Sequence, residues 1–230
     1  MPQPKIPKYF LLFLFAVSVF GLVLAPLLVL QPNLQGEQPP LRRPLVSAMY
    51  SVICVVGIVA VFYPSKCRVM FQKPNVSFDA KKPSASKVQF KGHHPDCEKF
   101  SANRVTIRGS VFCAACSGLL IGAIATLAGA VLFFLGFFDF GTGSFWVLVA
   151  GAVLMFAGLF QIKLAGYVKV AVNALFVVGS FFMLAAADSA AQSWLVNAYV
   201  LGLIVFMLCF RILLSEWNNE NVCLACGHCI

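Results

Sequence analysis

The chain has 230 residues, of which 60% are hydrophobic and 11% are charged, and its mean hydropathy is +0.89. A soluble domain carries about 25% charged residues and 45–50% apolar ones, so this chain lacks the residues that cover a soluble fold. The apolar excess also excludes a disordered, collagen-like or soluble disulfide-rich chain. The composition therefore indicates an integral membrane protein.

Six stretches are long and apolar enough to cross a bilayer, which requires roughly 20 helical residues. They are Tyr9–Leu30, Leu45–Tyr63, Cys116–Phe138, Phe145–Ile162, Val170–Ala187 and Trp194–Leu214. The first is longer than the core of a signal peptide, so we expect a retained anchor. The continuous runs lack the alternation of barrel strands. We predict an all-α integral membrane protein with about six transmembrane helices and a small Cys/His metal-knuckle loop between helices 2 and 3.

The basic residues assign the ends of these helices to sides of the membrane. With the N-terminus inside, 15 of the 17 lysines and arginines fall in inner segments, and only Arg42 and Arg43 fall in outer ones. The positive-inside rule therefore predicts a cell-membrane protein with both termini and the loop 64–112 in the cytoplasm. The loop shows no aromatic platform interleaved with its basic residues, so no nucleic-acid partner is expected.

The predicted organisation has four parts. Residues 1–63 form a two-helix membrane hairpin, 64–112 a cytosolic basic linker and Cys/His knuckle, 113–215 a four-helix membrane bundle, and 216–230 a cytosolic Cys-rich tail. Within the loop, the alternation at 88–90 and 104–107 predicts short strands, and a turn at 108–110 leads into Val111 and Phe112. Strands this short cannot build a hydrophobic core of their own. We therefore expect an additional cross-link, such as a bound metal, to stabilise the loop.

Nine cysteines are present. Cys54 and Cys209 lie inside predicted spans, where they are expected to pack as small apolar side chains. The other seven cysteines and all three histidines fall on the predicted cytoplasmic side. A reducing compartment disfavours disulfides and favours metal or redox chemistry.

The first cluster contains His93, His94 and Cys97, followed after 15 residues by Cys113 and Cys116. The two-residue gap lets both sulfurs of Cys113 and Cys116 bind one metal, and His94 and Cys97 offer a matching pair, as in structural zinc sites. His93 is a further candidate ligand. Unligated thiols and iron–sulfur or redox chemistry are the alternatives.

The second cluster reads Cys223-Leu224-Ala225-Cys226-Gly227-His228-Cys229. Its three cysteines could hold zinc with one further ligand, for which His228, His93 and Cys67 are candidates. They also match the opening of a ferredoxin-type run, which makes an iron–sulfur cluster the alternative cofactor. The sequence leaves open whether the two clusters share one metal.

A short segment resembles a known signature. Its residues are Gly92-His93-x-Pro95, Phe100, Gly109, Cys113-Ala114-x-Cys116-x-Gly118 and Gly122. They resemble a family of uncharacterised prokaryotic multi-span membrane proteins with the signature Cys-His-x-x-Pro…Phe…Gly…Cys-Ala-Arg-Cys-Thr-Gly before a transmembrane helix. The match covers about 30 of the 230 residues, with Gly92 in place of the family's Cys and Ala115 in place of its Arg. The resemblance implies a membrane protein with a metal-type knuckle and no particular reaction.

Two features of the spans bear on function. Gly118, Gly122 and Gly129 form a stripe of small residues, which indicates close helix packing or a self-association face. No charged residue lies near a span centre, which disfavours ion-coupled transport. The cations Lys163, Lys169 and Arg211 flank spans and can snorkel to the membrane surface.

Three functions follow from these patterns. The leading hypothesis is a membrane protein with a cytosolic structural zinc site, serving as an accessory or scaffolding subunit that contacts lipid and other membrane subunits. The alternative is a redox protein that uses its Cys-x2-Cys pairs for iron–sulfur electron transfer or thiol–disulfide exchange, and the third is a metal-responsive sensor or metal handler. The chain shows no Ser–His–acid set and no Gly-rich phosphate loop, so no catalytic residue is assigned and a non-enzymatic role is favoured.

Overall fold

The computed structural model of the chain describes residues 6–31, 41–62, 90–91, 94–95, 98–107, 109–134, 136–137 and 139–226. Six helices in this part of the chain are long and apolar enough to span a membrane, which confirms the helical membrane fold. They are α1 (Lys8–Val29), α2 (Arg42–Phe62), α4 (Ala114–Phe134), α5 (Ser144–Gly158) continued by the 3-10 helix η4 (Leu159–Lys163), α6 (Gly166–Ala191) and α7 (Trp194–Cys226).

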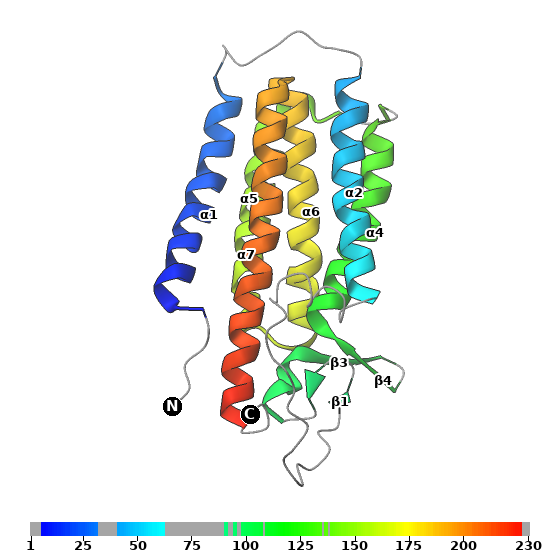
Figure 1. Ribbon diagram of the computed structural model, residues 1–230. Helices are drawn as coiled ribbons and strands as arrows, with labels where there is room; N and C mark the ends of the chain where they lie inside the picture. The colour runs from blue at the N-terminus through cyan, green and yellow to red at the C-terminus, as the bar shows by residue number, and fades with distance from the viewer. Residues whose placement is uncertain are drawn as a thin grey trace, which may run out of the picture.

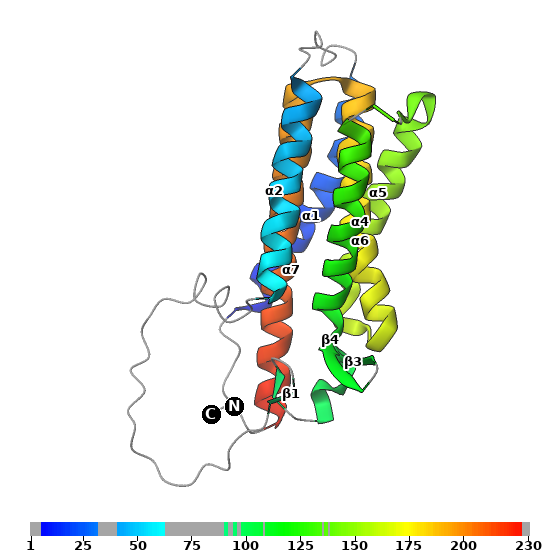
Figure 2. The same ribbon diagram turned by 90° about the vertical axis from the view of Figure 1, so that its right-hand side faces the viewer.

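The helices stand side by side as an elongated bundle, with α6 at its centre (Figures 1 and 2). Helix α6 contacts α4, α5 and α7. In its most apolar stretch 61% of the residues are buried, against 39% or fewer in the other five spans. The outer helices expose large apolar side chains such as Leu12, Phe20 and Trp146, as expected of surfaces that face lipid.

Short strands gather at one end of the bundle (Figure 1). They are β1 (Phe90–Lys91), β2 (His94–Pro95), β3 (Arg104–Ile107) and β4 (Ser110–Cys113), with the 3-10 helices η2 (Glu98–Asn103) before β3 and η3 (Gly141–Gly143) before α5. Antiparallel pairs form between β1 and β2 and between β3 and β4. The turn between β3 and β4 contains Gly109 at φ 81°, a left-handed conformation that glycine adopts at little cost. We call this end the hairpin end and the opposite one the far end.

The β3–β4 hairpin is docked on the start of α6. The Tyr167 hydroxyl donates a hydrogen bond of 3.0 Å to the Thr106 carbonyl, and the Lys169 ammonium donates to the Asn103 side chain. Phe100 and Val105 are buried beneath, with 1% and 4% of their surface exposed. The hairpin is therefore fixed to the membrane bundle by packing and by polar contacts, although its strands have only four residues each.

The stripe of small residues on α4 packs against α6 of the same chain. A Cβ placed on Gly122 would lie 2.7 Å from the Ala174 carbonyl oxygen, and Gly118 and Gly129 face Val170 and Phe181. These glycines therefore allow α4 and α6 to pack closely, as the simpler of the two interpretations predicted. Self-association stays a prediction.

A polar cluster joins three helices at the far end. Asp188 on α6 is fully buried, and its carboxylate accepts from Arg42 of α2 at 2.5 Å, from Arg43 at 3.2 Å and from the Asn197 amide of α7 at 2.6 Å. Arg43 also lies 3.5 Å from Asp139 in the connection before α5. We call Arg42, Asp188 and Asn197 the far-end cluster.

Helix α7 is longer than the predicted last span. That span ends at Leu214, but α7 continues to Cys226 and has 33 residues. The polar residues 216–221 do not end the helix, since they include neither glycine nor proline. At 1.5 Å per residue α7 is roughly 50 Å long, whereas the hydrocarbon core is about 30 Å thick. Its last turns therefore stand clear of the bundle beside the strands, where Figure 1 draws the red end of α7.

Candidate functional site

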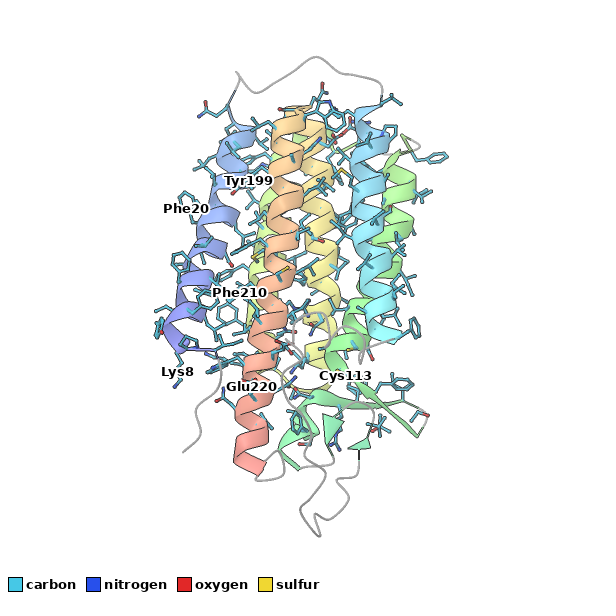
Figure 3. The ribbon with its side chains drawn as sticks, viewed as in Figure 1. Lys8, Phe20, Cys113, Tyr199, Phe210 and Glu220 are labelled. Carbon is cyan, nitrogen blue, oxygen red and sulfur yellow. The ribbon has the colours of Figure 1, made fainter. Side chains whose placement is uncertain are left out.

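Two cysteines that form no disulfide lie at the junction between the hairpin and the bundle. Cys113 is the last residue of β4 and Cys116 is the third residue of α4. Because the strand passes directly into a helix, the two side chains come together, and a hydrogen bond links the thiols. Both are half-buried. Figure 3 shows Cys113 at the hairpin end, level with Lys8 at the start of α1.

The local fold around this pair follows from the hairpin register. Cys113 lies opposite Arg104, and Ile107 lies opposite Ser110 next to the turn. Ala114, which follows Cys113 and starts α4, is fully buried. The first turn of α4 is thus held against the bundle. Its unpaired N–H groups favour negative charge nearby, including that of thiolates.

Two buried cations face the cysteine pair. Lys169 on α6 and Arg211 on α7 are 6% and 4% exposed. The charge of Arg211 acts on Cys116, and that of Lys169 interacts with Cys113. Because both side chains are enclosed by the bundle, the expectation that they snorkel to the membrane surface is wrong.

Neutral groups hold these cations in place. The Arg211 Nη2 atom donates to the Gln161 side chain at 2.8 Å, and the guanidinium carbon lies 4.6 Å from the centroid of the Phe176 ring. Lys169 donates to Asn103. The salt bridges between described residues involve Arg42 and Arg43 instead, at the far end.

Several polar atoms at this end have no partner. Nε and Nη1 of Arg211 and Oδ1 of Asn173 are buried without a hydrogen bond. An unsatisfied buried donor costs about 1–3 kcal/mol, and a charged one costs more. An anionic partner would satisfy the two unpaired nitrogen atoms of Arg211.

The structure brings together two of the nine predicted site residues. His94 lies in β2, and Cys223 and Cys226 lie in the last turns of α7. His93, Cys97, His228 and Cys229 are outside the described residues. Within the part of the chain that the structure describes, no group of three or more His, Cys, Asp or Glu side chains is positioned to hold a metal.

The described elements next to the remaining candidates, η2 and the last turns of α7, lie at the same end of the bundle. Helix α7 contacts η2, which immediately follows the segment containing Cys97. Figure 3 places Glu220 of α7 at the level of Cys113. Cys223 and Cys226 are three residues apart on α7, a spacing that places residues on one helical face.

Sequence reasoning missed the buried role of Lys169 and Arg211. A signal was present, because Arg211 interrupts an otherwise apolar run from Val205 to Leu214. A charge within such a run that faces the bundle interior marks a functional site by default. Hydropathy alone could not say whether this side chain reaches the surface or turns inward.

No protein-family model, curated protein or solved structure matches this chain. The resemblance of residues 92–122 to a prokaryotic membrane family stays a prediction.

Proposed function

We propose that the chain is a membrane protein with a structural zinc site at its hairpin end, facing the cytoplasm, and that it serves as an accessory or scaffolding subunit of a membrane complex. One observation carries the proposal. Cys113 and Cys116, which form no disulfide, lie together beside two buried cations, and the salt bridges between described residues include neither cation. A thiolate pair would balance that charge.

Zinc fits the chemistry of this donor set. Two thiolates spaced by two residues are a common half of a structural zinc site. His94 and Cys97 are the best candidates for the other half, because two residues separate them in the sequence, as in the Cys113/Cys116 pair. Three thiolates and one neutral imidazole around Zn²⁺ leave one net negative charge. The buried guanidinium of Arg211 would then be the counter-charge.

The size of the hairpin supports a stapling role. Its two strands have four residues each, and a two-stranded hairpin alone is marginally stable in water. Structural zinc contributes on the order of 10 kcal/mol, which is ample to organise such a segment. A zinc-stapled platform on a rigid bundle is suited to hold a partner chain.

Metal content of the full chain tests the proposal. We expect one or two zinc ions per chain and no visible absorption in protein purified in detergent without chelator. Cys113→Ser should lose one zinc ion and make the hairpin sensitive to protease while the helices stay inserted. The matched control is Cys209→Ser, because Cys209 is an exposed thiol on α7, and it should keep its zinc.

Three results would change this assignment. Absence of zinc from the unmodified chain, or full zinc content in Cys113→Ser, would contradict a site built on this pair. Zinc that exchanges readily and moves the hairpin would favour a sensor or metal handler.

A redox role is the second candidate, and the contact between the thiols favours it. A cysteine in the first turn of a helix, next to a second thiol and to cations, is in an environment that makes thiols reactive. This function predicts either a brown iron–sulfur spectrum or a measurable dithiol–disulfide potential that disappears in Cys116→Ser. Colourless protein with unreactive thiols would eliminate it.

A further inference from the structure

A second feature lies away from the cysteine pair, in a groove between α1, η4 and α7. Its volume is about 320 Å³, within the range of roughly 300–1,000 Å³ that is usual for small-molecule sites. Apolar side chains make up most of its lining: Leu11, Leu12, Phe15, Leu159, Phe160, Ile162, Phe210, Leu214 and Trp217.

Helix α1 forms one wall of the groove and contacts α5, α6 and α7. The Tyr199 hydroxyl donates a hydrogen bond of 2.9 Å to the Gly21 carbonyl towards the far end. The rings of Phe15 and Phe160 meet with centroids 6.5 Å apart. One turn closer to the hairpin end, Leu12 lines the groove yet is 69% exposed. The groove therefore opens on the surface that faces lipid.

Two lysines give the groove a charged end. Lys8 at the start of α1 and Lys163 at the end of η4 both line it, and none of its lining residues is acidic. Figure 3 shows Lys8 at the hairpin end of α1, and Trp217 lines the same groove. Lysines and a tryptophan at a helix end are typical of the depth at which lipid headgroups lie.

We propose that this groove binds one anionic membrane glycerophospholipid, with an acyl chain against the apolar wall and the phosphate between Lys8 and Lys163. Charge complementarity identifies the occupant, because an apolar groove with two lysines at one end matches an amphiphile with an anionic headgroup. Basic pockets between transmembrane helices bind lipid headgroups in this way. The lipid then fills the space that separates α1 from α7, independently of the cysteine pair.

Native mass spectrometry of the full chain in detergent tests this site, using phosphatidylglycerol and phosphatidylcholine with identical acyl chains. We expect one tightly held phosphatidylglycerol and a preference for it over phosphatidylcholine. Removing both charges with Lys8→Gln and Lys163→Gln should reduce that preference by roughly tenfold or more. Leu12→Trp fills the groove and should reduce retention of either lipid.

The matched control removes two charges from the polar loop, with Lys81→Gln and Lys82→Gln, and should keep the preference. An equal loss in this control would assign the effect to general surface charge and overturn the site. An unchanged preference in the Lys8/Lys163 variant would overturn it too. So would undiminished phosphatidylglycerol binding in Leu12→Trp, since the lipid would then lie elsewhere.

Discussion

Arg211 is the residue whose environment most constrains what the hairpin end does. Its guanidinium is 4% exposed, it donates to a neutral amide at 2.8 Å, and two of its nitrogen atoms have no partner. Burying a charge without an opposite one is costly, so such groups are normally paired. The only candidates for a negative charge that the described residues place near it are the cysteine thiols. Arg211 is therefore expected to act as a positioning residue for the cysteine pair.

Replacing Arg211 tests this role. Arg211→Gln removes the counter-charge, and we expect zinc affinity, measured by competition with a chelator, to fall by roughly 10- to 100-fold, as for other outer-shell partners. Arg211→Lys keeps the positive charge, so its zinc affinity should fall less than that of Arg211→Gln. Arg43→Gln serves as the control, since Arg43 lies at the far end. Equal affinity in Arg211→Gln and the unmodified chain would show that the guanidinium does not serve the site.

At the scale of elements, the far-end cluster fixes the order of the helices. The Asp188 carboxylate of α6 accepts hydrogen bonds from Arg42 of α2 and from Asn197 of α7. Three helices are therefore joined at one carboxylate. The partners Asp188 and Arg42 are 146 residues apart in the chain. This cluster is enclosed by protein, whereas the neighbouring carboxylate of Asp139 is 53% exposed.

The two carboxylates predict contrasting effects on stability. Asp188→Asn leaves Arg42 buried without its charge partner, which typically costs 3–5 kcal/mol. Asp139→Asn removes an exposed pair at 3.5 Å and should cost about 0–1 kcal/mol. Thermal unfolding in detergent should therefore show a large fall in Tm for Asp188→Asn and a small one for Asp139→Asn. Similar falls in Tm for the two variants would show that the far-end cluster does not stabilise the bundle more than the exposed pair does.

The sequence predicted the elements better than their ends or their partners. Apolar length identified the six spans, and alternation identified β3, because both signals are local. The end of α7 was wrong, since polarity marks where the membrane ends rather than where a helix ends. The contacts of Asp188 and of Arg211 could not be predicted, because they depend on how helices rotate against distant neighbours.

At the scale of the whole molecule, the described residues form an apolar bundle with a polar cluster at each end. The far-end cluster includes a carboxylate, while the hairpin end buries two cations next to thiols. The start of α1, the hairpin and the end of α7 all lie at the hairpin end (Figure 1). One determination of sidedness therefore orients the candidate ligands that the structure describes.

Labelling with a membrane-impermeant maleimide provides that determination. Thr142 in η3 and Ser101 in η2 are both exposed and lie in elements at opposite ends. We expect Thr142→Cys to be labelled in intact cells, above the background of the native cysteines, and Ser101→Cys only after permeabilisation. The reverse pattern would place the cysteine pair outside the cytoplasm and would favour a disulfide over zinc.

The position of α7 in the chain also has a consequence for biosynthesis. This helix is made after α1 to α6, yet it supplies Asn197 to Asp188 at the far end and Arg211 beside Cys116 at the hairpin end. Chains fold largely from the N-terminus during synthesis. Both polar clusters thus stay incomplete until the last helix inserts, so a nascent chain that stalls before Trp194 lacks the Asn197 partner of Asp188 and the Arg211 cation beside Cys116.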